Sequence, residues 1–248
     1  MTGEGFRMDW RIRHRAVTES TNRDAIGGRP GDVFTAGMQT AGRGRLDHRW
    51  LSPPGENLMM SAVVDVAGMT PQAAATLPLA AGLSVAEAIR GVFFAQGKCE
   101  RASAVMVKWP NDVHVGWRKI CGILCERNGD SVIVGIGVNV NQTVFAPEIS
   151  GRATSVRIET GDALDVDSVR DAVLERLSEN VERLRKDGFA ALLPALDGFD
   201  CLKGRHVAVR RTDDDLAPAS GICGGIRPDG MLDVAGEAIS AGEAHVLP

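Results

Sequence analysis

Glycines and arginines alternate in the segment Gly42-Arg-Gly-Arg45, which lies within a wider polar run from Gln39 to Trp50. Glycine lets a backbone approach a ligand closely, and each guanidinium group presents forked donors to phosphate or carboxylate oxygens. The segment therefore predicts an anion-binding loop. A flexible, solvated basic loop has the same composition, and this segment alone does not separate the two.

Two further segments place polar side chains beside apolar strands. Lys108-Trp-Pro-Asn-Asp112 presents an amide and a carboxylate close together, and Asp112 could hold Mg²⁺ or orient a lysine, although the same letters suit an ordinary turn. Lys119 begins an apolar strand, where a lysine is costly unless an anion lies near or the side chain snorkels to water. Strict alternation would put one set of side chains on a single face of that strand, namely Lys119, Cys121, Ile123 and Cys125.

The run Gly135-Ile-Gly-Val-Asn139 continues another apolar strand, so two glycines fall inside it. A ligand or another backbone could come close there and bind Asn139, but a β-bulge with a satisfied asparagine explains the letters equally well. Standard nucleotide motifs do not fit, since Asp47 stands where the dinucleotide pattern beginning at Gly42 needs its third glycine. Any nucleotide must be held in another way.

The five cysteines are irregularly spaced and indicate packing rather than chemistry. Cys121 and Cys125 on one extended strand would lie about 13 Å apart, beyond the Cα separation of about 7 Å that a disulfide allows. No close His or Cys partners predict a zinc site, and His48 fits a solvated or phosphate-facing side chain better than a catalytic base. The odd count, without an apolar signal segment at the start, predicts a reducing, cytoplasmic setting.

The 248 residues are enough for one large domain or for one with a small partner. Hydrophobic residues make up 44% and charged residues 24%, which is typical of a folded globular chain and excludes long-range disorder. Lys and Arg number 28 against 32 Asp and Glu, a net charge of −4 that argues against nucleic-acid binding through overall charge. No run reaches the roughly 20 apolar residues that a membrane helix needs, so no membrane segment is expected.

Short apolar runs predict buried strands at 33–36, 58–64, 105–108, 119–125 and 131–138. Thr70 and Pro71 begin a helix that Pro78 kinks or restarts. Apolar spacing predicts a second helix from about Ser168 to Lys186, stopped by Gly188. Because strands and helices interleave without a regular repeat, we expect an α+β fold with a mixed sheet.

The texture changes after Gly204, where short strand-like pieces alternate with Asp, Gly and Pro turns. They predict a small β-barrel of about 45 residues, too small to be a solitary domain and therefore packed on the larger one. We expect the larger domain at 1–200 and the barrel at 201–248. The predicted strands of the barrel are 206–210, 221–226, 231–234 and 245–247.

Six segments follow one another along the chain: Glu19-Ser-Thr-Asn22, Gln39-Thr-Ala-Gly-Arg-Gly-Arg45, Trp50, Lys108-Trp-Pro-Asn-Asp112, Arg118-Lys-Ile-Cys-Gly-Ile123 and Gly135-Ile-Gly-Val-Asn139. In this order, and followed by a small β-barrel, they resemble the biotin protein ligases. Each motif is weak alone, but the ordered set is specific and spans nearly the whole chain. The resemblance implies a mixed-sheet biotin/lipoate ligase-like catalytic domain with an SH3-like C-terminal barrel.

The activity that this resemblance implies has two steps. Biotin and MgATP would form biotinyl-5′-AMP with loss of pyrophosphate, and biotin would then pass to one lysine of a biotin carboxyl carrier domain of an acyl-CoA carboxylase. Arg45 and Lys119 would be catalytic, because two cations relieve the repulsion between anionic reactants and stabilise charge on the phosphorus oxygens. The arginine-bearing loop would shield the adenylate from water.

The resemblance also assigns binding residues. The biotin pocket would be formed by Ser20, Thr21, Asn22, Gln39, Gly42, Arg43, Gly44, Arg45, Lys119 and Gly122. The ATP site would be formed by Arg45, Trp50, Asn111, Asp112, Lys119, Gly137 and Asn139, with Asp112 also as the Mg²⁺ ligand.

The chain departs from the family pattern in two places and lacks one module. After Arg45 it reads Leu-Asp-His-Arg where many relatives carry further Arg, Gly or Lys, and Cys121 stands where alanine is common. Some relatives carry an N-terminal helix-turn-helix of about 60 residues, for which there is no room before Ser20, so we expect no specific DNA binding.

Two alternatives stay open. A lipoate or octanoyl ligase or transferase shares the fold, and a transferase would use Cys121 for an acyl-enzyme, although the Gly42–Arg45 and Lys108–Asp112 segments argue against it. A non-catalytic biotin or nucleotide sensor is the second alternative, against which Arg45 and Lys119 argue. The sequence leaves open whether the chain forms a homodimer.

Overall fold

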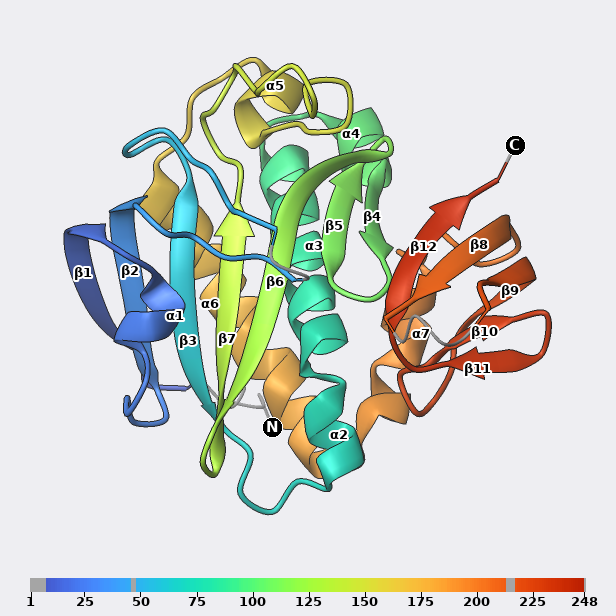
Figure 1. The fold of residues 1–248 in the computed structure, drawn as a ribbon. Helices are drawn as coiled ribbons and strands as arrows, with labels where there is room; N and C mark the ends of the chain where they lie inside the picture. The colour runs from blue at the N-terminus through green and yellow to red at the C-terminus, as the bar shows by residue number, and fades with distance from the viewer. Residues whose placement is uncertain (1–7, 46–47, 213–216, 248) are drawn as a thin grey trace, which may run out of the picture.

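The computed structural model describes residues 8–45, 48–212 and 217–247. Within these ranges the larger part of the chain forms a seven-stranded sheet in the order β1-β2-β3-β7-β6-β5-β4 (Figure 1). β1 and β2 pair in parallel and the other neighbours are antiparallel, which confirms the predicted mixed sheet. The strands are β1 (Arg11–Thr18), β2 (Asp32–Gln39), β3 (Leu58–Asp65), β4 (Val105–Lys108), β5 (Asp112–Val115), β6 (Arg118–Asn128) and β7 (Ser131–Val138).

Two long helices, α3 (Leu77–Ala95) and α6 (Val166–Asp187), cover one face of this sheet (Figure 1). The Thr70 hydroxyl accepts the Ala73 N–H at 3.1 Å and caps α2. Pro78 lies in the first turn of α3, so a new helix begins at this proline and no helix is kinked by it. The second predicted helix is confirmed as α6, which Gly188 ends. The short helices are α1 (Thr21–Asp24), α2 (Pro71–Ala75), α4 (Cys99–Ser103), α5 (Val156–Thr160), η1 (Phe189–Ala191) and α7 (Leu193–Asp197).

The C-terminal part forms a separate antiparallel sheet in the order β11-β10-β9-β8-β12. It confirms the small β domain, while its exact start at residue 201 stays a prediction. This sheet packs on the larger part, because Trp109 Nε1 donates a hydrogen bond to the Gly230 carbonyl at 3.1 Å and the buried residues of both parts form one cluster. Its strands are β8 (His206–Arg211), β9 (Ala219–Ile226), β10 (Leu232–Val234), β11 (Glu237–Ile239) and β12 (Gly242–Val246).

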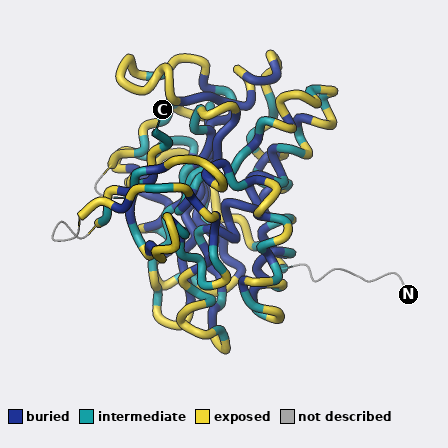
Figure 2. Tube along the Cα trace, turned by 90° about the vertical axis from the view of Figure 1, so that its right-hand side faces the viewer, coloured by how far each residue is buried: buried dark blue, intermediate teal, exposed yellow. Residues whose placement is uncertain are grey.

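Buried residues concentrate in the central strands and the helices behind them, and exposed residues lie at the periphery (Figure 2). Among the described residues, α3 is long and apolar enough to cross a membrane, but 67% of its apolar window is buried inside the protein, as in the core helix of a folded domain. The five strands predicted for the larger sheet are all present. β1, β5 and β11 were not predicted, and β1 is exposed along nearly its whole length, so no buried face shows in its sequence.

Candidate active site

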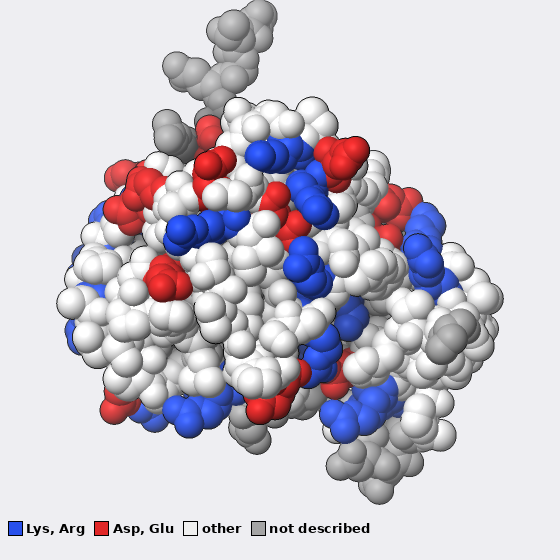
Figure 3. Space-filling model, turned by 90° about the horizontal axis from the view of Figure 1, so that it is seen from above, with Lys and Arg blue, Asp and Glu red and all other residues white. Residues whose placement is uncertain are grey.

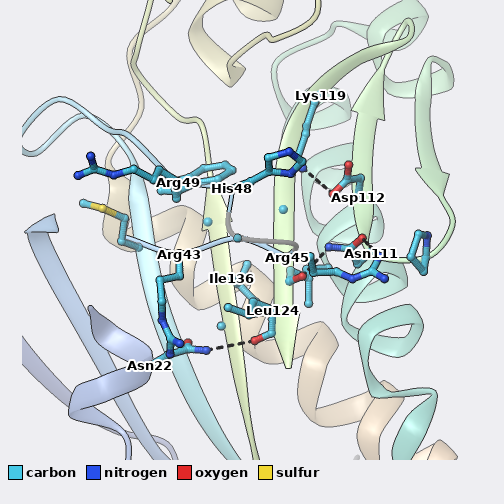
Figure 4. Close-up of a pocket in the computed structure, with 18 of the residues that line it drawn as sticks. Asn22, Arg43, Arg45, His48, Arg49, Asn111, Asp112, Lys119, Leu124 and Ile136 are labelled. Carbon is cyan, nitrogen blue, oxygen red and sulfur yellow. Dashed lines mark hydrogen bonds and ion pairs between the residues drawn. The ribbon is translucent and has the colours of Figure 1, made fainter. Parts of the chain in front are cut away.

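The segment after β2 crosses in front of β7 and β6 and encloses a pocket against the sheet face opposite α3 and α6 (Figures 1 and 4). Glycines of the strands make room for it. A Cβ on Gly137 would lie 2.6 Å from the Trp50 ring, and a Cβ on Gly122 would lie 3.2 Å from both Trp50 and Lys119. Both glycines of β7 are closely approached, but by side chains rather than by the predicted ligand or backbone: by Trp50 at Gly137 and by Asn22 at Gly135.

A neutral hydrogen-bonded cluster forms one end of the pocket. Gln39 Oε1 accepts the Thr21 N–H at 2.7 Å, and Ser61 Oγ lies 2.7 Å from Thr21 Oγ1 and 2.6 Å from Asn22 Oδ1. Ser20, Thr21 and Asn22 are all buried. These side chains offer donors and acceptors without net charge, in a site from which water is largely excluded.

Arginines of the crossing segment contact two separate parts of the sheet. Arg43 Nη2 lies 2.9 Å from both carboxylate oxygens of Glu126 on β6. Arg45 Nη1 donates to Asn111 Oδ1 at 3.0 Å (Figure 4). Asn111 in turn donates to the Ile123 carbonyl at 2.7 Å. Both arginines are thus held over the pocket by side chains of the sheet.

Lys119 and Asp112 form an ion pair at the other end, with 2.7 Å between Nζ and Oδ1 (Figure 4). His114 Nε2 lies 4.0 Å from the second oxygen of Asp112. Burial acts to raise the pKa of Asp112, but the His114 side chain and the Lys119 ammonium outweigh it and hold that pKa below its ordinary value. Asp112 is therefore ionised at neutral pH, and of the two roles considered for it, orienting a lysine is the one seen here.

The predicted alternation along β6 is wrong for Lys119, whereas Cys121, Ile123 and Cys125 share the core side as predicted. Val113 of β5 pairs with Cys121 while His114 pairs with Lys119, so Ile120 is an extra residue and forms a β-bulge. The bulge shifts the alternation between Lys119 and Cys121, which puts Lys119 and Gly122 together on the pocket side and Cys121 in the hydrophobic core. Burial also raises the pKa of the Cys121 thiol far above its usual range, so this residue is a packing thiol.

Most predicted site residues are brought together, with exceptions. Asn139 is buried outside the pocket wall and donates to the Thr154 carbonyl at 2.9 Å, and Gly42 lies behind the wall, where its carbonyl accepts the Trp50 N–H at 3.0 Å. Of the four residues after Arg45 that depart from the family pattern, Leu46 and Asp47 lie outside the described residues. The wall contains the predicted residues Ser20, Thr21, Asn22, Gln39, Arg43, Gly44, Arg45, Trp50, Asn111, Asp112, Lys119, Gly122 and Gly137.

Sequence reasoning missed several residues of the site. Lys108 and Glu243 line the pocket, Ser61 joins the neutral cluster, and Glu126 binds Arg43. Ser61 carried a signal, since it is the one polar residue within the predicted apolar strand 58–64. Glu243 comes from β12, so the small domain contributes to the mouth of the pocket.

Among the described residues, the pocket wall holds five cationic side chains and two carboxylates, although the whole chain carries a net charge of −4. Viewed from above, Lys and Arg side chains gather in a band across the molecule (Figure 3). Such a pocket favours an anionic ligand. The cations are Arg43, Arg45, Arg49, Lys108 and Lys119, and the carboxylates are Asp112 and Glu243.

Comparison with known proteins agrees with this chemistry. Residues 16–142, just over half of the chain, match the Biotin/lipoate A/B protein ligase family. A biotin–[acetyl-CoA-carboxylase] ligase from Paracoccus denitrificans is 33% identical over 235 residues, which cover 90% of this chain and 93% of that protein. The bifunctional ligase/repressor BirA of Escherichia coli (strain K12) is 31% identical over 225 residues, 87% of this chain but only 66% of the repressor.

A solved structure extends the likeness to the whole fold. The biotin protein ligase from Aquifex aeolicus in complex with biotin and ATP has a TM-score of 0.82 and 28% sequence identity, and the alignment covers 95% of this chain and 99% of that one. Both the catalytic sheet and the small C-terminal sheet are therefore shared. From the family match and this full-length likeness it follows that the chain belongs to the biotin/lipoate A/B protein ligase family, and within it to the biotin protein ligases.

Proposed function

We propose that the enzyme joins biotin to ATP and then transfers the biotinyl group to a lysine of a biotin carboxyl carrier domain. The observation that carries this proposal is a single pocket with a neutral polar end and a cationic end, enclosed by the segment that bears Arg43 and Arg45. The relatives from Paracoccus denitrificans and Mycobacterium tuberculosis, both named biotin–[acetyl-CoA-carboxylase] ligase, support the carrier domain as the acceptor.

The neutral end suits the ureido ring of biotin, which has N–H donors and a carbonyl acceptor but no charge. Gln39 Oε1 already accepts from Thr21, so its Nε2 is the group left to donate to a ligand. Ser20 and Thr21 supply further hydroxyls in the same wall, and the fully buried Ser61 hydroxyl lies 2.7 Å from that of Thr21. A planar polar ring bound there would direct its carboxylate-bearing chain along the wall toward the cations.

The cationic end suits the reacting carboxylate and the α-phosphate. A carboxylate oxygen of biotin would bond to the α-phosphorus as the bond from phosphorus to the bridging oxygen breaks and pyrophosphate leaves. Lys119 and Arg45 would neutralise the charge that gathers on the phosphorus oxygens. In the second step a deprotonated carrier lysine would attack the acyl carbon, and AMP would leave.

Mg²⁺ fits this site as an ion carried by ATP. Among the described residues no group of three or more His, Cys, Asp or Glu side chains could hold a metal ion alone. Asp112 offers one ionised carboxylate, which suits an ion that takes its remaining ligands from phosphates and water. Bound there, Mg²⁺ would neutralise phosphate charge. The buried indole N–H of Trp50 has no acceptor among the described residues and could donate a hydrogen bond to the nucleotide.

The competing acyl-transferase reading needs an accessible nucleophilic cysteine, which Cys121 in the core does not provide. We also propose a cytoplasmic location, because all five cysteines are free. We further propose that the ligase does not bind a DNA operator specifically, which a gel-shift assay tests.

The decisive experiment incubates the purified protein with MgATP and either biotin or octanoate, with and without an apo-carrier domain, and weighs the products by mass spectrometry. Biotinyl-AMP alone, and a biotin-modified carrier in the complete mixture, are expected. Octanoyl transfer would replace the proposal with the lipoate-type reaction, and biotin binding without either product would indicate a sensor.

A further inference from the structure

The described residues between Gly42 and Trp50, namely 42–45 and 48–50, are here called the arginine loop and have open space on both sides. One side faces the pocket, and the other faces a second hollow whose described lining includes Arg23, Arg49 and Glu126. Within the loop, the Trp50 N–H donates to the Gly42 carbonyl at 3.0 Å and the Gly44 N–H to the His48 carbonyl at 2.6 Å. These bonds shape the described part of the loop, and its contacts with the sheet side come from the side chains of Arg43, Arg45 and Trp50.

Glu126 provides one such attachment and contacts the neutral end of the pocket as well. Its carboxylate oxygens each lie 2.9 Å from Arg43 Nη2, and Oε2 also accepts the Asn22 amide at 2.6 Å. Asn22 binds Ser61 through its other amide atom, and a Cβ on Gly135 would lie 2.9 Å from its Cγ. A continuous chain of contacts thus runs from the neutral cluster through Asn22 and Glu126 to the arginine loop.

We propose that Glu126 is a positioning residue that couples ligand binding at the neutral end of the pocket to the position of the arginine loop. A ligand that binds Thr21 and Gln39 fixes Ser61 and the Asn22 amide, which in turn orients the Glu126 carboxylate toward Arg43. The inference rests on the proposed binding of biotin at that end. It assigns a role to a residue that touches neither ligand in that proposal.

The local environment separates this role from a purely structural one. The Arg43 and Glu126 side chains are 47% and 33% exposed, and an ion pair so exposed to water adds little to global stability. Glu126 lies near the end of β6, past the residues that pair with β5, so its side chain is not needed to fill the core. Its removal should therefore change ligand affinity and loop position but not folding.

The test compares Glu126→Gln with Asp130→Asn, a matched loss of one negative charge in the turn that follows the same strand. Three quantities are measured: the KM for biotin against kcat in pyrophosphate release, the rate of tryptic cleavage after Arg45 and Arg49 with and without biotin, and the thermal midpoint. For Glu126→Gln we expect the KM for biotin to rise about tenfold with a much smaller change in kcat. Biotin should also lose its protection of the loop from trypsin, while the thermal midpoint stays within about 2 °C of that of the unaltered protein.

The double variant Arg43→Met, Glu126→Gln tests whether Glu126 acts through Arg43. Its KM for biotin should equal that of Arg43→Met alone, because the coupling is already broken. Unchanged biotin KM and unchanged protection in Glu126→Gln would overturn the inference, as would equal effects of Asp130→Asn or a large fall in the thermal midpoint. If the unaltered protein makes no biotinyl-AMP, the proposed function fails, but protection by biotin alone still tests Glu126.

Discussion

Gly135→Ala is the substitution whose effect the structure determines most directly. Gly135 lies in the middle of β7, paired with Ser61 of β3 on one side and Leu124 of β6 on the other, so its backbone has no room to shift. A Cβ there would overlap Asn22 Oδ1 and lie 2.9 Å from Asn22 Cγ and 3.0 Å from Nδ2. The Asn22 amide must therefore leave its position.

The size of the effect follows from what Asn22 would lose. Its hydrogen bonds with Ser61 and Glu126, both 2.6 Å long, contribute about 1 kcal/mol each to the free energy of unfolding. Overpacking in a closed site costs a further 1–3 kcal/mol or so. The lower chain entropy of unfolded Ala returns about 0.5–1 kcal/mol. The net loss is about 2–4 kcal/mol, which lowers the thermal midpoint of a chain of this size by about 5–15 °C.

Thermal unfolding and the KM for biotin measure the two consequences, because the displaced amide belongs to the end of the pocket that we propose binds biotin. Gly91→Ala is the control, because its added Cβ would meet nothing within 4 Å outside the adjacent residues and the surrounding turns of α3. This substitution should stabilise α3 by about 0.5–1 kcal/mol. In an Asn22→Ala background, Gly135→Ala should cost less than about 1 kcal/mol, since the clashing amide is gone. A Gly135→Ala protein with an unchanged midpoint and unchanged KM would refute the reasoning.

Three further outcomes are expected. Burial acts to raise the pKa of Asp32, but the Arg29 N–H and the Arg11 guanidinium lower it overall. The folded pKa is then below the unfolded one, so Asp32→Asn should cost about 1–2 kcal/mol in urea unfolding at pH 7. That difference should vanish as the pH falls through the folded pKa, and a pH-independent difference would contradict it. Lys119→Met should slow single-turnover pyrophosphate release by about 10²–10³-fold, and a rate near that of the unaltered enzyme would exclude Lys119 from the chemistry. At pH 8 a disulfide reagent should label the exposed Cys99 first, as peptide mass mapping would show. Burial raises the pKa of the other four thiols, namely Cys121, Cys125 (to about 12), Cys201 (to about 12) and Cys223 (to about 11). Rapid labelling of any of these four in the folded protein would contradict their buried placement.

The buried strands were predictable from the sequence because burial on both faces leaves a continuous apolar run. The runs at 105–108 and 131–138 coincide with β4 and β7 to the residue. β1 gives no such signal, since it is the edge strand, its residues from Arg11 to Val17 are exposed, and it is held by backbone pairing with β2 and by ion pairs of Arg11 and Arg13 with Asp32. An exposed edge strand cannot be told from a polar loop by hydrophobic pattern alone.

The site was predictable where its residues occur in compact motifs and not where it depends on register. The side of β6 on which Cys121 lies depends on a bulge at Ile120, which exists only because β5 pairs with β6 on both sides of it. Glu126 resembles any charged residue near a strand end until α1 and the arginine loop are brought beside it. Asn139 follows two glycines in sequence, yet its side chain binds a backbone carbonyl outside the pocket, the bland alternative for an asparagine in that run.

Three of the five cations in the pocket wall already have side-chain partners in the protein. Lys119 pairs with Asp112, Arg43 with Glu126, and Arg45 with the Asn111 oxygen. An anionic substrate therefore exchanges one set of partners for another, and the net gain is smaller than the number of cations suggests. The two ends differ in what the exchange of partners would do. If Lys119 binds a phosphate, it releases the Asp112 carboxylate, which is then free to bind Mg²⁺. Arg43 has no anionic ligand in the proposal that would draw it away from Glu126. On the proposed function, charge neutralisation at the Lys119 end and attachment of the arginine loop at the Arg43 end would be separable roles of one cationic pocket.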